Sequence, residues 1–166
     1  LPLTTIGYAA PGAVLGIGIL VPLAFFDNWL ADRIFDLTRY DHGLIFTGTA
    51  FAIILAYCVR FFSIAQQTVD GALGRVSPSL PNAARSLGRN KLQVLWEIYR
   101  PLISASTATA LLLVFVDCVK ELPATMLLRP FNFETLATRV HVQASLEDLP
   151  NAAPGAILIV LIGLCA

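Results

Sequence analysis

Charged residues are scarce in this sequence. Only 13% of its 166 residues are Asp, Glu, Lys or Arg, about half the share found in an ordinary soluble domain. Hydrophobic residues make up 57% of the chain, and its mean hydropathy is +0.74. Basic and acidic residues number 11 each, so the net charge gives no indication of nucleic-acid binding. The composition excludes a typical soluble domain and predicts a membrane protein.

Motifs for metal, redox or nucleotide chemistry are also missing. Cys58, Cys118 and Cys165 lie in or beside apolar runs without the spacing of zinc or redox motifs, and we expect them to be small apolar residues. His42 and His141 have no carboxylate or cysteine at ligand spacing, so no metal site is predicted. No Gly-x-x-x-x-Gly-Lys-Ser/Thr phosphate loop is present, so ATP would have to bind to a partner. We expect no cofactor on this chain.

Apolar runs point to several membrane-spanning helices, since a helix needs about 20 apolar residues to cross a bilayer. We predict spans near residues 8–26, 43–64, 102–118 and 153–166. Because the sequence starts without Met and stops inside an apolar run, we expect a fragment of a longer chain. The predicted fold class is all-α, a polytopic bundle of transmembrane helices.

Small residues predict close helix contacts in two of these runs. Gly12 and Gly16 lie four apart in the first run, a spacing that lets another helix approach closely. A general tolerance of glycine in membrane helices explains them equally well. The third run contains only small residues from Ser104 to Ala110, which predicts contact with neighbouring helices rather than with lipid.

The basic residues are unevenly distributed, and cytoplasmic loops carry an excess of Lys and Arg. The segment between the second and third runs, with its flanks, contains Arg60, Arg75, Arg85, Arg89, Lys91 and Arg100 against Asp70 and Glu97. The loop between the first two runs contains Asp27, Asp32, Asp36 and Asp41 against Arg33 and Arg39. We therefore predict a cytoplasmic loop at 65–101 and outward-facing segments on either side. Arg60 is expected to reach the membrane interface from the end of its run.

The cytoplasmic loop has two helix-favouring stretches, 82–87 and 91–99, separated by Gly88. Glycine enters left-handed backbone conformations at little cost, so Gly88 is predicted to make the bend between two short helices. Pro101 suits the first turn of the helix that re-enters the membrane.

This loop resembles the Glu-Ala-Ala loop of binding-protein-dependent (ABC) importer permeases. The family pattern is Glu-Ala-Ala, three residues, Gly, nine residues, Ile, two residues, Pro. The residues that match in type and spacing are Ala83, Ala84, Gly88, Ile98 and Pro101. Asn82 replaces the leading glutamate; its side chain can still accept an N-cap hydrogen bond, but a charge often offered to the ATPase is missing. The resemblance implies that Asn82 and the five matching residues dock on a separate ATPase subunit.

Two further segments are similar to the ferric-iron permeases of that family, in which two such halves are fused in one chain. They are Gly7 to Gly12 and a segment made of Val116 to Thr125, Leu128 to Phe133 and Leu136 to Arg139. The resemblance implies the C-terminal half of a permease in the bacterial inner membrane, supplied with ferric iron by a periplasmic solute-binding protein. Its partners would be that protein, the ATPase, the other permease half and the lipid bilayer. Permeases for other small solutes share much of this pattern, so another solute stays open.

Asp117, Lys120 and Glu121 cluster where the third run ends. Charged groups at membrane depth are costly, which indicates either pairing or a solute pathway. Asp117 and Lys120 are three apart and can pair on one helix face. Ferric iron prefers oxygen ligands, so Asp117 and Glu121 are candidate pathway groups, with ordinary ion pairing at a helix end as the alternative. A membrane enzyme is a weaker hypothesis than a transporter, because no nucleophile with a base partner appears in the sequence. A purely structural membrane subunit is a second weaker hypothesis.

Overall fold

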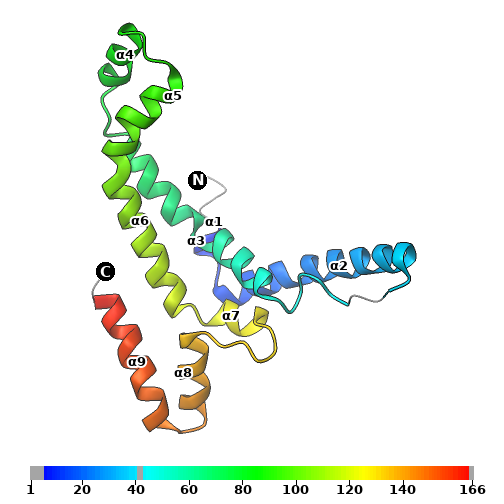
Figure 1. Cartoon of the computed structure of the whole chain (residues 1–166). Helices are drawn as coiled ribbons and strands as arrows, with labels where there is room; N and C mark the ends of the chain where they lie inside the picture. Colours follow the sequence, from blue (N-terminus) through cyan, green and yellow to red (C-terminus); the bar gives the residue numbers. More distant parts are fainter. Residues whose placement is uncertain (1–5, 41–42, 165–166) are drawn as a thin grey trace. The chain divides into compact units, whose positions relative to one another are not determined.

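The computed structural model describes residues 6–40 and 43–164, and the regular secondary structure within them is helical (Figure 1). Contacts divide the chain into a first unit, Leu1–Phe62 with Val116–Ala166, and a second unit, Ser63–Phe115. Asp41 and His42 lie outside the described residues, as do Cys165 and Ala166, the last two residues of the predicted fourth span.

Three of the helical runs are long and apolar enough to cross a membrane, among the described residues. They are α2, α3 and the continuous run Lys91–Lys120, and α9 is a shorter apolar helix. The elements are α1 Ile6–Ala9, α2 Gly12–Thr38, α3 Ala50–Leu73, α4 Ser79–Ser86, α5 Lys91–Val94, the π-helical turn η2 Leu95–Tyr99, α6 Arg100–Lys120, α7 Pro123–Leu128, α8 Leu136–Ser145 and α9 Leu149–Leu164. The predicted all-α membrane class is confirmed.

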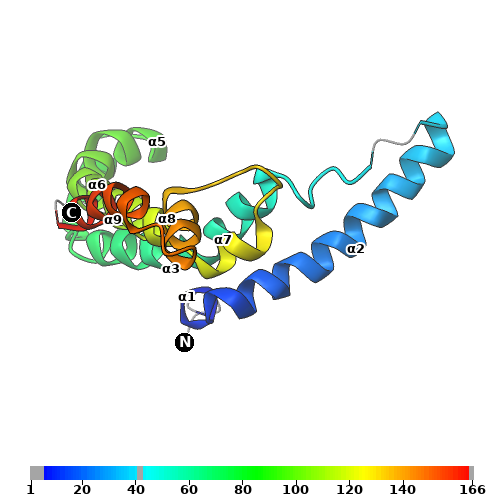
Figure 2. The same ribbon diagram turned by 90° about the horizontal axis from the view of Figure 1, so that it is seen from below.

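The first apolar run has different helix limits from the predicted span 8–26. The chain breaks at Pro11, and Figure 2 draws α1 and α2 as separate helices. Proline lacks an N–H and disfavours helical backbone at the preceding residue, which accounts for the break. Beyond residue 26, α2 continues to Thr38 and ends at Arg39, whose φ is 57°. Asp32 and Asp36 therefore lie on a helix rather than in a connecting loop.

Asp27 is a buried residue of α2 whose carboxylate holds the loop that leads into α3. Its two oxygens accept the backbone N–H groups of Ile45 at 2.9 Å, Phe46 at 2.9 Å and Thr47 at 2.6 Å. Hydrogen bonds to an ionised acceptor are the stronger kind. This loop occupies the start of the predicted span 43–64, so α3 begins only at Ala50.

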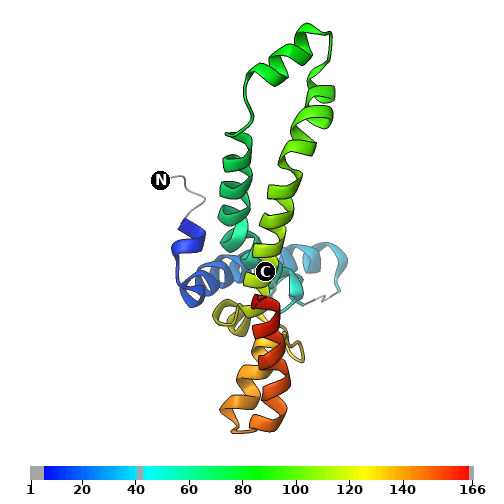
Figure 3. The ribbon, with the colours of Figure 1, turned by 90° about the vertical axis from the view of Figure 1, so that its left-hand side faces the viewer.

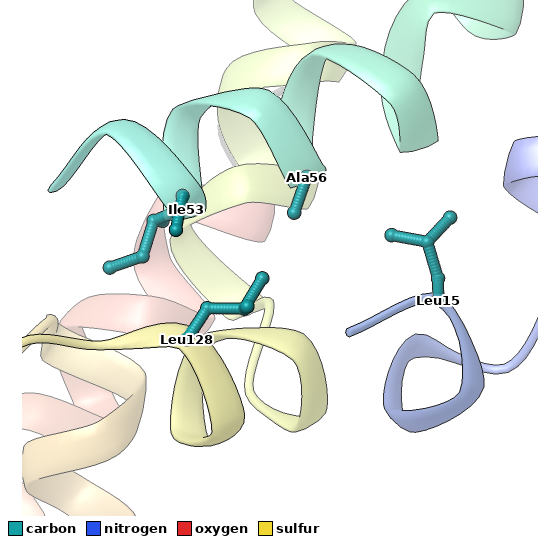
Figure 4. Close-up of a cluster of buried hydrophobic side chains, with 5 residues drawn as sticks. Leu15, Ile53, Ala56 and Leu128 are labelled. Atoms are coloured by element: carbon teal, nitrogen blue, oxygen red, sulfur yellow. The ribbon is translucent and has the colours of Figure 1, made fainter. Parts of the chain in front are cut away.

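The apolar core of the first unit joins α2, α3 and α7. Leu15 of α2 and Leu128 of α7 lie next to Ile53 and Ala56 of α3 in Figure 4. Each of these four side chains is buried. The short helix α7 therefore closes this core against both longer helices.

Gly16 marks the contact between α2 and α7. A Cβ atom there would lie 3.1 Å from Leu127 Cδ1 and 3.5 Å from Ala124 Cα. Gly12, one turn earlier, would place a Cβ 3.3 Å from Pro123 Cβ, whereas Gly18 faces open space. The predicted close approach at Gly12 and Gly16 is confirmed, and the element that approaches is α7.

Helices α8 and α9 form a hairpin in the first unit, visible in Figures 1 and 3. At Gly155 of α9 a Cβ atom would lie 2.6 Å from Val140 Cγ2 of α8, so glycine permits the contact. The turn between them places Glu147 at φ 60°. In it Asp148 N–H donates to Gln143 O at 2.9 Å.

The second unit contains the whole connection between the two long helical runs. The chain leaves α3, passes through α4, turns, and returns through α5 and η2 into α6 (Figure 3). The predicted pair of short helices at 82–87 and 91–99 is therefore present, and α4 begins three residues earlier than predicted, at Ser79.

Candidate functional site

The bend between α4 and α5 is formed at Gly88, whose φ is 84°. Arg89 N–H donates to Ala84 O at 3.1 Å, and Gly88 N–H donates to Arg85 O at 3.0 Å. This pair of bonds is the Schellman arrangement that ends a helix on a left-handed residue. A Cβ atom at Gly88 would meet nothing within 4 Å. Glycine is therefore needed for its backbone conformation rather than for space, and the predicted bend is found.

A capping box starts α5 immediately after this bend. Asn90 Oδ1 accepts the Gln93 N–H at 2.8 Å, and Gln93 Oε1 accepts the Asn90 N–H at 2.9 Å. Reciprocal caps of this kind satisfy two otherwise unpaired donors at a helix start. An ion pair between Arg89 Nε and Glu97 Oε2, 3.3 Å apart, joins the turn to η2. The angle between α4 and α5 is thus set by several local bonds.

The first half of the importer motif, on α4 and in the turn after it, is accessible to a partner. Asn82, Ala83 and Gly88 are exposed, and Ala84 is half-buried. Leu87, beside Gly88, is 84% exposed. The predicted N-cap role of Asn82 is wrong, because α4 begins earlier and its N-cap is Pro78. Asn82 instead lies at the fourth residue of α4, with its side chain exposed.

The second half of the motif lies on the helix that leads into α6. Ile98 belongs to η2, where the Arg100 N–H donates to Leu95 O. Pro101 follows in the first turn of α6, and a proline ring clashes with the carbonyl four residues before it, here that of Glu97. Widening the helix into one π turn accommodates the proline, and such turns are frequent at functional sites.

A second cluster, in the first unit, brings the predicted pathway residues together. Lys120 Nζ lies 2.6 Å from Asp117 Oδ1, so the predicted pairing of these two residues is confirmed. Glu121 lies next to Arg60, with 3.2 Å between Oε2 and Nε. The Arg60 and Glu121 side chains are only 18% and 6% exposed.

Hydrogen bonds from two residues of α7 fix the position of Glu121. Its Oε1 accepts the Ala124 N–H at 3.2 Å, and its backbone carbonyl accepts the Thr125 hydroxyl at 3.1 Å. That hydroxyl also lies 2.6 Å from the hydroxyl of Tyr57 on α3. Gly12 provides the necessary room, since a Cβ there would lie 2.7 Å from both Arg60 Nη1 and Glu121 Oε1.

These charged groups border a cavity of about 280 Å³. It is lined by Tyr8, Arg60, Phe61, Asp117, Lys120 and Glu121, and below we call it the Arg60 cavity. Arg60 was predicted to reach the membrane interface, but it is largely buried against Glu121 instead. Its position as the only charged residue in the run 43–64 is the sequence signal that identifies it.

The carboxylates at the Arg60 cavity each face a cation rather than a shared metal position. Within residues 6–40 and 43–164, no three His, Cys, Asp or Glu side chains gather as metal ligands. His141 is exposed on α8. The cluster therefore has the chemistry of paired charges beside a small polar space.

Known proteins similar to this chain are bacterial permeases. The Fe(3+)-transport system permease protein FbpB 2 of Haemophilus influenzae is 31% identical over 149 residues, which cover 90% of this chain and 27% of that protein. The ferric transport system permease protein FbpB of Actinobacillus pleuropneumoniae is 27% identical, over 86% of this chain and 20% of that protein.

A relative named for a different solute matches a similar share of the chain. The putative 2-aminoethylphosphonate transport system permease protein PhnV of Salmonella typhimurium is 28% identical over 155 residues, 93% of this chain and 51% of that protein. The chain thus spans about half or less of the length of these relatives. Residues 1–166 all match the family of binding-protein-dependent transport system inner membrane components, so the chain belongs to that family of inner-membrane transport subunits and is not an enzyme.

Proposed function

We propose that this chain forms part of the permease of an ATP-driven importer, which moves a solute from a periplasmic binding protein to the cytoplasm. The observation that supports this most directly is the exposed, rigidly capped turn at Gly88, which carries the importer motif. ATP would be hydrolysed on a separate ATPase subunit. The second permease half would come from the same longer chain.

The coupling element would be Asn82, Ala83, Ala84, Gly88, Ile98 and Pro101. The small side chains of Ala83 and Ala84 allow a partner surface to come close to α4. The helical run Lys91–Lys120 continues without interruption from α5 through η2 into α6.

The proposed orientation places the loop 65–101 in the cytoplasm, and two exposed residues test it. A cysteine at Ser79 should be labelled by a membrane-impermeant reagent only from the cytoplasmic side, and a cysteine at Asn132 only from outside. Labelling of both from one side would contradict the orientation. Co-purification of the full-length permease with an ATPase tests the coupling role, and absence of any ATPase would count against it.

Ferric iron is the first candidate solute, because several relatives are named as ferric-iron transport permeases. In this proposal Asp117, Lys120 and Glu121 lie along the translocation pathway, which their shared position on the Arg60 cavity supports. Asp117→Asn and Glu121→Gln should lower transport but leave ATPase association intact. Normal transport by both variants would reduce these residues to structural ion pairs.

An aminoalkylphosphonate is the second candidate, because the relatives named for 2-aminoethylphosphonate match 93% of this chain. Uptake by proteoliposomes that contain the complete transporter and its binding protein distinguishes the two. Radiolabelled ferric iron and 2-aminoethylphosphonate are offered separately, and ATP-dependent accumulation of one identifies the solute. Accumulation of neither would remove both candidates.

A further inference from the structure

Arg60 has hydrogen-bond donors that the described part of the chain leaves unused. Its Nε and Nη1 atoms are buried, and neither makes a hydrogen bond to a described residue. Nε lies 3.2 Å from Glu121 Oε2, so the two groups attract as charges without meeting hydrogen-bond geometry. A guanidinium group carries five N–H donors in a planar fork. Buried donors without acceptors are costly, so this fork is suited to an acceptor from outside the chain.

Glu121 leaves both of these Arg60 donors without a hydrogen bond in this structure. Oε1 accepts the Ala124 N–H, and Oε2 faces Arg60 Nε. The hydroxyl group of Thr125 on α7 donates to the Glu121 carbonyl and lies within hydrogen-bond distance of the Tyr57 hydroxyl. The described residues therefore supply no hydrogen-bond acceptor to Arg60 Nε and Nη1, and the Arg60 cavity is the space beside this side chain that an outside acceptor can occupy.

Lys120 adds a second cation to the same cavity. Its side chain is 60% exposed and contacts Asp117 through one oxygen at 2.6 Å. An ammonium group has three donors, so this single contact leaves it able to bind another acceptor. The two carboxylates are each balanced by one of the two cations, and no described group of three acidic, His or Cys ligands is available to hold a bare metal ion.

We propose that the Arg60 cavity binds an oxyanion group of the transported solute, a phosphonate, phosphate or carboxylate, with Arg60 and Lys120 as donors. The planar fork of arginine matches the two oxygens of such a group. A cavity of about 280 Å³ has room for a group of this size. The inference rests on the proposed importer function and specifies its solute class. Ferric iron prefers oxygen ligands, so a ferric ion that is bound to oxyanions would offer the same oxygen acceptors to Arg60 and Lys120.

Methylphosphonate is the probe for this site, because it carries the oxyanion alone and its ³¹P signal reports binding. The purified full-length permease in detergent should broaden this signal in a saturable way. Arg60→Gln should weaken binding about tenfold or more, as expected when a charge-assisted hydrogen bond is lost. Lys120→Gln should weaken it less. Arg139→Gln, which removes an exposed arginine of the same unit, should leave it unchanged.

Several outcomes would overturn the proposal. They are an absence of saturable binding by the unmodified protein, and equal binding by Arg60→Gln. Arg60→Gln could fail to fold because Glu121 loses its partner, and the double variant Arg60→Gln/Glu121→Gln then removes both charges together. Undiminished methylphosphonate binding by this double variant would also overturn the proposal. Displacement of methylphosphonate by phosphatidylglycerol would assign the site to a lipid headgroup instead of a solute.

The importer function is measured on the same preparations and is separable from this site. ATP-driven uptake and ATPase co-purification without oxyanion binding would defeat the site and leave the permease proposal standing. Oxyanion binding without ATPase association would support the site and contradict the proposed importer function.

Discussion

Two ion pairs in this chain have nearly identical atoms and distances but different surroundings. Arg60 Nε lies 3.2 Å from Glu121 Oε2, and Arg89 Nε lies 3.3 Å from Glu97 Oε2. The first pair is 18% and 6% exposed, whereas the second is 49% and 48% exposed. Solvent therefore surrounds much more of the exposed pair than of the buried one.

The difference indicates that distance alone does not predict what an ion pair contributes. Removing one member of a buried pair leaves a charge without compensation, whereas exposed pairs contribute little. The buried pair also connects α3 to the residues just before α7, while the exposed pair joins the turn after α4 to η2, eight residues further along the chain. The following four predictions test this contrast, from the largest expected effect to the smallest.

Glu121→Ala should be the most damaging change, with a loss of about 3–5 kcal/mol in stability. It leaves the Arg60 guanidinium buried without its partner and removes the acceptor of the Ala124 N–H. Thermal denaturation of the detergent-purified full-length protein measures the loss. The double variant Arg60→Gln/Glu121→Gln should recover much of it, and a double variant no better than Glu121→Ala would show that charge compensation is not the cause.

Gly12→Ala should act on the same pair without removing a charge. The new methyl group would lie 2.7 Å from both Arg60 Nη1 and Glu121 Oε1, and overpacking of this kind costs about 1–3 kcal/mol. Gly18→Ala, in the same helix but facing open space, is the matched control. Equal melting temperatures for the two variants would contradict the close approach at Gly12.

Gly88→Val tests the turn that the exposed pair accompanies. A β-branched residue at φ 84° costs about 1–2 kcal/mol relative to glycine, so the turn should rearrange while membrane insertion survives. The expected result is normal membrane level, with weak ATPase co-purification or ATP hydrolysis without uptake. Gly88→Asn, which tolerates left-handed backbone better, should be milder. Normal uptake by Gly88→Val would remove the main support for the coupling element.

Glu97→Ala should have the smallest effect, a loss of about 0.2–1 kcal/mol that shrinks as salt is added. The Gly88 turn and the Asn90 capping box remain intact in this variant, so ATPase association should persist. Thermal denaturation at low and high salt measures the change. A loss as large as that of Glu121→Ala would mean that the second pair is buried in the complete transporter.

The turn at Gly88 could be predicted from the sequence because its determinants are local. Gly88 and the helix-favouring stretches beside it lie within a few residues of one another, and the structure contains both the bend and the two helices. The pairing of Asp117 with Lys120 was accessible for the same reason, since residues three apart share a helix face.

Other features could not be predicted because they depend on residues far apart in the chain. The contact between Arg60 and Glu121 requires α3 and the start of α7 to come together, and no local pattern encodes that. The limits of α2 were missed for another reason. Hydropathy indicates which residues favour a lipid environment, but it does not indicate where a helix ends. The end of α2 is set by the left-handed backbone conformation of Arg39.

The carboxylate of Asp27 has a consequence for biosynthesis. Its partners at Ile45, Phe46 and Thr47 are 18 to 20 residues further along the chain, so they leave the ribosome after α2 is complete. Until then, a charge that is buried in the finished fold has no backbone donors and disfavours entry of that part of α2 into lipid. Helices α2 and α3 are therefore expected to enter the bilayer together as a hairpin, with Asp27 delaying the first helix until the second follows.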